Sequence, residues 1–285
     1  MKKLIIQQIL SEYFDKYQID QILQKLTGFT KNQLFFCEEL DDITESTLKI
    51  ITEQSKNWIP FEYIINKAEF YGLDFYVDNR VLIPRNDTEI MVDLVIGSLD
   101  NQLNSGPVLI DIWTGSSCIP LSILENTPKI IETHVVDISE KALEVSKINI
   151  QKYKNNIQQY LWSLYSPLIS KDFSQSPLFI TANLPYIKDN DFDNMSIETI
   201  THEPDLALYG WKETWFELYE QLIQQIIQQI DQKLLQTVFL YIEIWFDQKE
   251  YTESYLTKLG LKYSIHKDNS WIDRCVQIEF DSYLK

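Results

Sequence analysis

Three short polar segments of this sequence each follow an apolar run, and their side chains could bind a ligand together. The first begins at Asp111 and reads Asp-Ile-Trp-Thr-Gly-Ser-Ser-Cys, the second is Asp137, 26 residues later, and the third begins at Asn183, 46 residues further on. Short apolar runs of this kind are typical of buried strands. Because ligands bind at the carboxyl ends of parallel strands, the three segments are candidates for one site.

The first segment is a turn of small residues that leads into a predicted helix. Such a turn lets backbone N–H groups approach a ligand, and the helix N-terminus favours a carboxylate. A plain strand-to-helix turn has the same character, so this segment alone leaves both interpretations open. The candidate ligand-binding residues are Asp111, Trp113, Thr114, Gly115, Ser116 and Ser117.

Asp137 stands at the end of the second predicted strand. A carboxylate at that place can accept hydrogen bonds from both hydroxyls of a ribose. The alternative is an aspartate that begins a helix and binds nothing. Together with the small-residue turn, Asp137 favours a ligand that contains adenosine.

The third segment, Asn183-Leu-Pro-Tyr186, offers a socket for a planar nitrogen group. The side-chain oxygen of Asn183 and a backbone carbonyl can each accept a hydrogen from an –NH2 group, and the ring of Tyr186 can pack on its plane. An ordinary turn is the alternative. Its place after an apolar strand favours a catalytic and substrate-binding segment made of Asn183, Leu184, Pro185 and Tyr186.

The surrounding pattern predicts an α/β fold with a doubly wound, mostly parallel sheet and a small helical domain in front of it. Residues 1–66 show helical spacing of apolar residues only. Residues 69–84 alternate apolar and polar side chains around Asp78-Asn79, which predicts a β-hairpin. We therefore expect a helical domain at 1–66, and a hairpin linker with the sheet domain at 67–285.

From residue 108 onward, apolar strands alternate with helices, the pattern of a Rossmann-like sheet. The predicted strands are 108–112, 133–138, 178–183 and 237–244, followed by an antiparallel pair at 261–268 and 275–280. The predicted helices of this part are 118–125, 139–153 and 221–236, and a further helix is predicted ahead of it at 90–99.

Composition argues against several classes of protein. The chain has 25 Lys and Arg against 42 Asp and Glu, a net charge of −17, which disfavours a protein that clamps duplex nucleic acid. Three cysteines that lie far apart predict no disulfide framework and suit a reducing cytoplasm. The three histidines do not cluster, so we expect no metal site. No apolar run reaches about 18 residues, so we expect no membrane span.

With these segments in place, the sequence resembles the HemK/PrmC family of class I S-adenosylmethionine-dependent methyltransferases. That family methylates the side-chain amide of a glutamine in peptide-chain release factors. The similarity begins near residue 58 and runs to the C-terminus, and the segment Leu-Ile-Pro-Arg-x-x-Thr-Glu is its most specific part. The matching segments are 60–72, 81–89, 111–118, 135–139, 182–187, 202–208, 241–248 and 272–276.

The resemblance implies a role for each candidate residue. Asp137 would hold the ribose of S-adenosylmethionine, residues 113–117 would hold its methionine end, and Ser163 and Leu164 would also contact it. Asn183 and Pro185 would hold the glutamine amide of the release factor, with Tyr186 packed against it. The resemblance also implies a cytoplasmic monomer whose residues 1–66 recognise the substrate.

The sequence departs from the family pattern at its tryptophans. It has 7 Trp and only 7 Gly in 285 residues, whereas an average chain has about 7% Gly. Each tryptophan stands where the family has glycine, so we hypothesise that UGA codons for glycine were translated as tryptophan. The seven are Trp58, Trp113, Trp162, Trp211, Trp215, Trp245 and Trp271. Leu184 also replaces a family proline, which is tolerable because this residue contributes mainly its backbone.

Two other functions remain open at this stage. A nucleic-acid adenine N6-methyltransferase would use the same socket for an exocyclic amine, although the acidic charge counts against it. A non-catalytic binding module would follow if Trp113 is genuine, because an indole there would fill the space that a methionine moiety needs.

Overall fold

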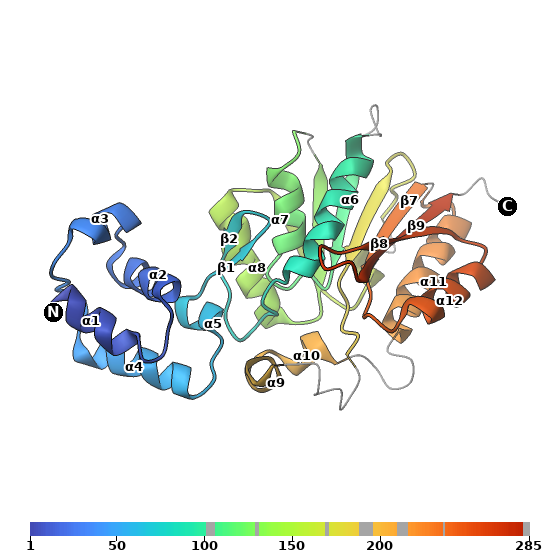
Figure 1. Ribbon diagram of the computed structural model, residues 1–285. Coiled ribbons are helices and arrows are strands. Elements are labelled where there is room, and N and C mark those ends of the chain that lie inside the picture. The colour runs from blue at the N-terminus through green and yellow to red at the C-terminus, as the bar shows by residue number, and fades with distance from the viewer. Residues whose placement is uncertain are drawn as a thin grey trace. The chain divides into compact units, whose positions relative to one another are not determined.

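The computed structural model describes residues 1–100, 106–128, 131–168, 171–187, 196–209, 216–235 and 237–281 (Figure 1). Backbone contacts divide the chain into two compact units. The first consists of Met1–Lys67 with Phe192–Glu203, and the second of Ala68–Asp191 with Pro204–Lys285. The first boundary falls one residue after the expected one at 66, and the first unit also takes in a segment from much later in the chain.

The first unit is helical, and its helices begin and end at residues suited to those places. Asp15 and Thr30 each cap a helix by accepting from the backbone N–H three residues later, and Gly28 ends a helix with a φ of 70°. Leu10, Ile22 and other apolar side chains form its core. The helices are α1 (Lys3–Leu10), α2 (Lys16–Thr27), α3 (Lys31–Phe36), α4 (Glu45–Lys56), α5 (Phe61–Ile65) and α9 (Ile197–His202).

The second unit is built on a seven-stranded sheet, and its topology confirms the predicted Rossmann-like class. The order is β5-β4-β3-β6-β7-β9-β8; the first five strands run parallel and β9 is antiparallel to both of its neighbours. In this order the strands are β5 (Ile157–Leu161), β4 (Glu132–Asp137), β3 (Val108–Ile112), β6 (Leu178–Ala182), β7 (Thr237–Glu243), β9 (Asp273–Asp281) and β8 (Lys262–Lys267).

Helices cover both faces of this sheet, and the buried strands are apolar on both sides as a result (Figure 1). Leu109 packs with α6, α7 and α8 on one face, whereas Ile110 packs with α11 and α12 on the other. The helices are α6 (Glu89–Asp100), α7 (Cys118–Glu125), α8 (Glu140–Tyr153), α10 (Asp205–Leu208), α11 (Glu217–Asp231) and α12 (Lys249–Lys258), with short 3-10 helices η1 (Asn86–Thr88) and η2 (Ser166–Leu168).

The hairpin before the sheet is shorter than predicted, and its turn lies elsewhere. Strands β1 (Ala68–Phe70) and β2 (Leu73–Phe75) pair through a turn at Tyr71 and Gly72, whose φ angles of 51° and 72° suit a two-residue hairpin turn. Asp78 does form a turn, because its carboxylate accepts from the Arg80 N–H, but no strands flank it. The predicted position of the hairpin turn, at Asp78-Asn79, was therefore wrong.

Candidate active site

The three polar segments meet at one edge of the sheet. In the register of the sheet, Ile112 at the end of β3 lies opposite Val136 of β4 and opposite Ala182 of β6. The loop that follows β3 is therefore flanked by Asp137 on one side and Asn183 on the other. The strand order reverses direction at β3, and this is where such sheets bind ligands.

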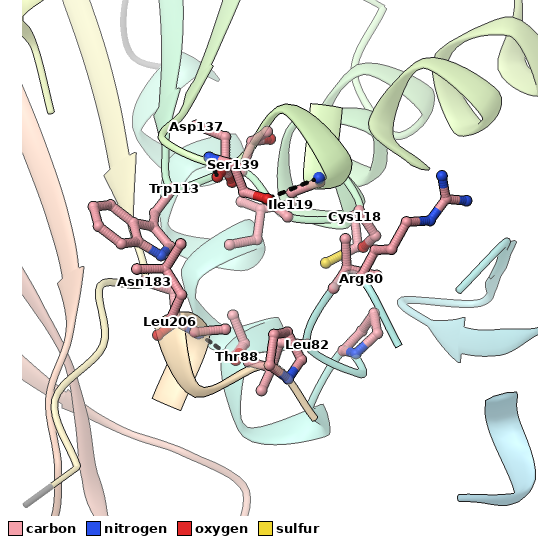
Figure 2. A pocket seen from close by; sticks show the side chains of 18 of the residues that line it. Arg80, Leu82, Thr88, Trp113, Cys118, Ile119, Asp137, Ser139, Asn183 and Leu206 are labelled. Atoms are coloured by element: carbon pink, nitrogen blue, oxygen red, sulfur yellow. Dashed lines mark hydrogen bonds between the residues drawn. The ribbon is translucent and has the colours of Figure 1, made fainter. Parts of the chain in front are cut away.

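A cavity lies at this edge, within the second unit (Figure 2). Predicted site residues on its wall are Trp113, Thr114, Gly115, Ser116, Asp137 and Asn183. The other lining residues are Arg80, Val81, Leu82, Pro84, Arg85, Thr88, Cys118, Ile119, Ser139, Ala142, Pro204, Leu206 and Ala207.

Asp137 is held in the cavity wall by backbone donors. Its two carboxylate oxygens accept from the N–H of Gly115 at 2.9 Å and from the N–H of Ser139 at 2.8 Å. Burial raises the pKa of Asp137 to about 6, although these hydrogen bonds act in the opposite direction. Each carboxylate oxygen has a further lone pair, so the group can still accept hydrogen bonds from two hydroxyls.

Asp111 lies beneath the loop and outside the lining of the cavity. It is 1% exposed, and its carboxylate accepts from the hydroxyls of Thr114 and Thr181, each at 2.6 Å. Burial raises its pKa to about 7, against the effect of those two donors. Ser117 is also buried, and its hydroxyl pairs with that of Ser146. Asp111 and Ser117 thus support the loop from behind.

Trp113 is the most unusual residue of the loop. Its backbone lies in the left-handed region with a φ of 65°, and its N–H donates to the carbonyl of Val136 at 2.8 Å. Figure 2 shows the indole on the same side of the cavity as Asn183. The side chain therefore takes up space beside the predicted substrate socket.

The segment from Asn183 to Tyr186 is fixed by buried hydrogen bonds. The N–H of Leu184 donates to the hydroxyl of Tyr219, while the Leu184 side chain lies in the hydrophobic core. Leu184 does not line the cavity. Pro185 is buried, and Tyr186 is half-buried with its hydroxyl donating to Glu243 at 2.6 Å. Burial and the neighbouring carboxylate raise the pKa of Tyr186 well above its ordinary value.

Ser163 and Leu164 stand apart from the other predicted residues. They follow β5, and Leu164 is buried in the core beneath the sheet edge. Neither lines the cavity. The backbone N–H of Trp162 donates to the carbonyl of Asp137 at 2.9 Å, which keeps this segment next to the end of β4.

Sequence reasoning did not assign several residues of the site. Arg80 and Thr88 line the cavity from the segment around 81–89, and Leu206 lines it from α10. Glu243 ends β7 and accepts hydrogen bonds from both Thr88 and Tyr186. The available signal was the family resemblance of 81–89, 202–208 and 241–248, which marked the segments but not which side chains point to the site.

The described residues contain neither a group of three or more metal-ligating His, Cys, Asp and Glu side chains nor a helix long and apolar enough to span a membrane. Arg80, which lines the cavity, forms ion pairs with Asp78 at 2.7 Å and with Glu144 at 2.6 Å.

No protein-family model matches the chain. Among curated proteins, it is 33% identical over 210 residues to the release factor glutamine methyltransferase of Clostridium acetobutylicum, covering 71% of this chain and 72% of the relative. It is 32% identical over 212 residues to the protein of that name from Thermodesulfovibrio yellowstonii, covering 72% and 73%. A bifunctional methyltransferase of Rickettsia prowazekii is 33% identical over 219 residues, which are 70% of this chain but only 39% of that longer protein.

Solved structures share the fold at low sequence identity. The catalytic domain of human METTL16 superposes with a TM-score of 0.53 at 15% identity, covering 75% of this chain and 77% of that chain. A second structure, the N-terminal domain of human METTL16, gives a TM-score of 0.51 at 17% identity, with 75% and 76% covered. At such identities the likeness concerns the architecture of the sheet and its helices.

Proposed function

The chain belongs to the family of release factor glutamine methyltransferases, and from this premise we propose that it methylates release factors. The methyl group of S-adenosylmethionine passes to the side-chain amide nitrogen (N5) of the glutamine in their Gly-Gly-Gln loop. The observation that carries the proposal is that Asn183, an amide-binding candidate, lines the same cavity as the ribose-binding candidate Asp137 and the loop between them.

The described residues fit the nucleoside part of the cofactor. Asp137 offers carboxylate oxygens that remain able to accept from two ribose hydroxyls, and Leu82 and Ile119 give the same cavity apolar walls. S-adenosylmethionine supplies an electrophilic methyl group on a positively charged sulfur. Thr114 and Ser116 line the cavity just before α7 begins, and we assign the methionine end of the cofactor to them because a helix N-terminus favours a carboxylate.

Asn183 and the carbonyl of Leu184 are proposed to orient the glutamine amide. An amide nitrogen is a poor nucleophile because its lone pair is delocalised. When both of its N–H groups donate to fixed acceptors, electron density on the nitrogen rises and the nitrogen is aimed at the methyl carbon. Bound S-adenosylmethionine would supply the methyl group, and Asn183 and the Leu184 carbonyl would hold the amide nitrogen while its displaced proton passes to solvent. Well-oriented approach is worth on the order of 7–11 kcal/mol.

We propose that the tryptophans at glycine positions reflect UGA codons that the source organism reads as glycine. Three of them, Trp58, Trp113 and Trp271, have φ angles of 59°, 65° and 64°. An L-residue pays about 1–2 kcal/mol in this region, whereas glycine enters it readily. If the gene has UGA at all seven positions the proposal holds, and a UGG codon at position 113 contradicts it and favours a non-catalytic binding module.

We further propose that the first unit carries a docking surface for the release factor. Leu4, Phe35 and Phe36 have exposed fractions of 75%, 78% and 82%. The Lys3 ammonium donates to the carbonyls of Leu34 and Phe35, so the start of α1 lies beside the end of α3. The proposed enzyme acts as a cytoplasmic monomer on protein and not on nucleic acid, in keeping with its net charge of −17.

Methyl transfer can be tested on a full-length chain in which all seven tryptophans are changed to glycine, called the sevenfold variant below. We expect it to label a release factor with methyl from labelled S-adenosylmethionine, and to lose this labelling when the loop glutamine is changed to alanine. Asn183→Ala should abolish turnover but leave cofactor binding largely intact. Labelling of adenine in DNA, with none in the release factor, would instead support a nucleic-acid adenine methyltransferase.

A further inference from the structure

Glu243 links two segments that meet at the substrate end of the cavity. It ends β7, and only 2% of the residue is exposed. Its Oε2 accepts the hydroxyl hydrogen of Thr88 at 2.5 Å, and its Oε1 accepts that of Tyr186 at 2.6 Å. Thr88 ends η1 in front of the sheet, whereas Tyr186 follows β6. One buried carboxylate therefore joins the segment that ends at Thr88 to the segment that holds Asn183.

The bond between Thr88 and Glu243 restricts how Thr88 can interact with Asn183. A hydroxyl has a single hydrogen, and an ionised carboxylate can only accept, so the hydrogen of Thr88 is committed to Glu243. Towards Asn183 the Thr88 oxygen can then only accept, and it does so from Nδ2 at 3.4 Å (Figure 2). An Asn183 carboxamide that turns its NH2 to Thr88 keeps its Oδ1 available as an acceptor.

Charged groups around Glu243 influence whether it stays ionised. Burial raises its pKa, and Asp87 acts in the same direction, while the hydroxyls of Thr88 and Tyr186 and the guanidinium of Arg274 lower it. Arg274 is itself buried, and it is fixed by donation to Asp268 at 3.1 Å and to the carbonyl of Ile244 at 3.4 Å. The fold thus places a fixed positive charge near a carboxylate that already receives two hydrogen bonds.

We propose that Glu243 is a positioning residue that acts through Thr88 to set the orientation of the Asn183 carboxamide. In this orientation Asn183 Oδ1 accepts a hydrogen from the –NH2 group of the substrate. The opposite orientation would direct Asn183 hydrogens at an –NH2 group whose delocalised lone pair accepts poorly, so the substrate amide would be repelled. The inference rests on the proposed methyl transfer to a glutamine amide and adds how the enzyme selects that amide.

Kinetic measurements on the sevenfold variant test whether Glu243 acts on Asn183 through Thr88, a coupling called the relay below. Thr88→Val removes the hydroxyl at nearly constant volume, and Glu243→Gln introduces an NH2 group that can donate to Thr88. We expect each change to lower kcat by about tenfold or more, because a misdirected buried hydrogen bond is costly. KM for the release factor and the affinity for S-adenosylhomocysteine should change little. Thr88→Ser should recover most of the rate that Thr88→Val loses, because it restores the hydroxyl.

A double variant separates a shared relay from two independent defects. If Glu243 acts through Thr88, the Thr88→Val change should cost much less rate in the Glu243→Gln background than in the parent. Multiplicative losses in the double variant, or parental kcat in both single variants, would overturn the inference. Thermal unfolding of every variant shows whether a loss of rate reflects a loss of folded protein. If Glu243→Gln fails to fold, the kcat of the isosteric Thr88→Val variant alone tests the inference.

A spectroscopic readout does not depend on turnover. The side-chain amide resonances of Asn183, assigned by their disappearance in Asn183→Asp, should shift in Thr88→Val and in Glu243→Gln. The exposed acid Glu250 of α12 provides a matched control, because Glu250→Gln should leave them in place. If the resonances respond but the parent transfers no methyl to a release factor, the proposed function fails. If the parent is active and the resonances do not respond, the positioning role fails.

Discussion

The backbone N–H of Gly115 donates to the carboxylate of Asp137 at 2.9 Å, so the loop after β3 is tied directly to the end of β4. The same carboxylate accepts from the N–H of Ser139, at the start of α8. One side chain therefore shapes the loop after β3, and in the proposed function it also offers the acceptors for the ribose of the cofactor.

We predict that Asp137→Ala weakens S-adenosylhomocysteine binding by about 1–3 kcal/mol, the usual cost of losing a charged acceptor. Isothermal titration calorimetry on the sevenfold variant measures this. Glu140→Gln, which removes an exposed acid three residues away, is the control and should bind like the parent. Because the pKa of Asp137 is raised to about 6, affinity should also fall as the pH drops below that value. Equal affinities for Asp137→Ala and its parent would place the ribose elsewhere.

The buried Asp111 predicts a dependence of folding stability on pH. Its pKa rises from an ordinary value of 3.8 to about 7 in the folded protein. Between these values the folded state keeps a proton that the unfolded state has released, so stability is greatest below pH 4 for this group and is lost as the pH rises through 7. At about 1.4 kcal/mol per tenfold change, the loss is on the order of 4 kcal/mol.

Urea unfolding of the parent and of Asp111→Asn at pH 5 and pH 8 tests this prediction. The variant cannot titrate at this position, so it should lose less stability than the parent between the two conditions. Asp137 contributes with the same sign in both proteins, and the difference between the two curves therefore isolates Asp111. Parallel curves would mean that the hydroxyls of Thr114 and Thr181 keep the carboxylate ionised throughout.

Part of this site follows from the sequence because it depends on strand ends. Asp137 and Asn183 close apolar strands whose parallel pairing brings their ends to one edge, and the structure places both on the cavity wall. Strand β5 escaped prediction because Ile157 to Leu161 includes the polar pair Gln158-Gln159 on a half-exposed sheet margin. Pattern alone gave no reason to expect a strand there.

Other parts depend on tertiary contacts that no local pattern encodes. Thr88 and Glu243 are 155 residues apart and meet only when η1 packs at the end of β7. The apolar alternation of 69–84 also continues beyond the true hairpin, because residues such as Val77 and Val81 are buried in segments that are not strands. Buried residues spaced in this way give the sequence the same apolar alternation as a strand.

Backbone strain at tryptophan predicts an unusual response to glycine. Trp271 is 80% exposed and has a φ of 64°, so its side chain contributes little burial while its backbone is strained. Trp271→Gly should stabilise the protein by about 1 kcal/mol, since relief of strain exceeds the entropy cost of glycine. Trp162 is also exposed but has no positive φ, and Trp162→Gly should destabilise by about 0.5–1 kcal/mol. Chemical denaturation compares the two, and the same sign for both would remove the structural support for glycine at position 271.

The exposed aromatic pair of α3 predicts a difference between whole and truncated substrates. Phe35 and Phe36 lie edge to face with ring centroids 5.2 Å apart, and both are exposed. If they dock the release factor, changing both to alanine in the sevenfold variant should raise KM for the intact release factor by about tenfold, as expected for aromatic anchors of an interface. The rate constant kcat should stay near the parental value, because neither ring belongs to the cavity.

KM for a short peptide that carries only the Gly-Gly-Gln loop shows whether a rise in KM for the intact factor reflects lost docking. Such a peptide lacks the rest of the factor, which is the part that would contact the docking surface, so its KM should be the same for the parent and for the Phe35→Ala, Phe36→Ala protein. Ile148→Ser, a change at an exposed apolar residue of α8, is the matched control and should leave both KM values unchanged. An equal rise of KM for the peptide and for the intact factor would show that the aromatic pair supports folding of the enzyme and does not bind the partner.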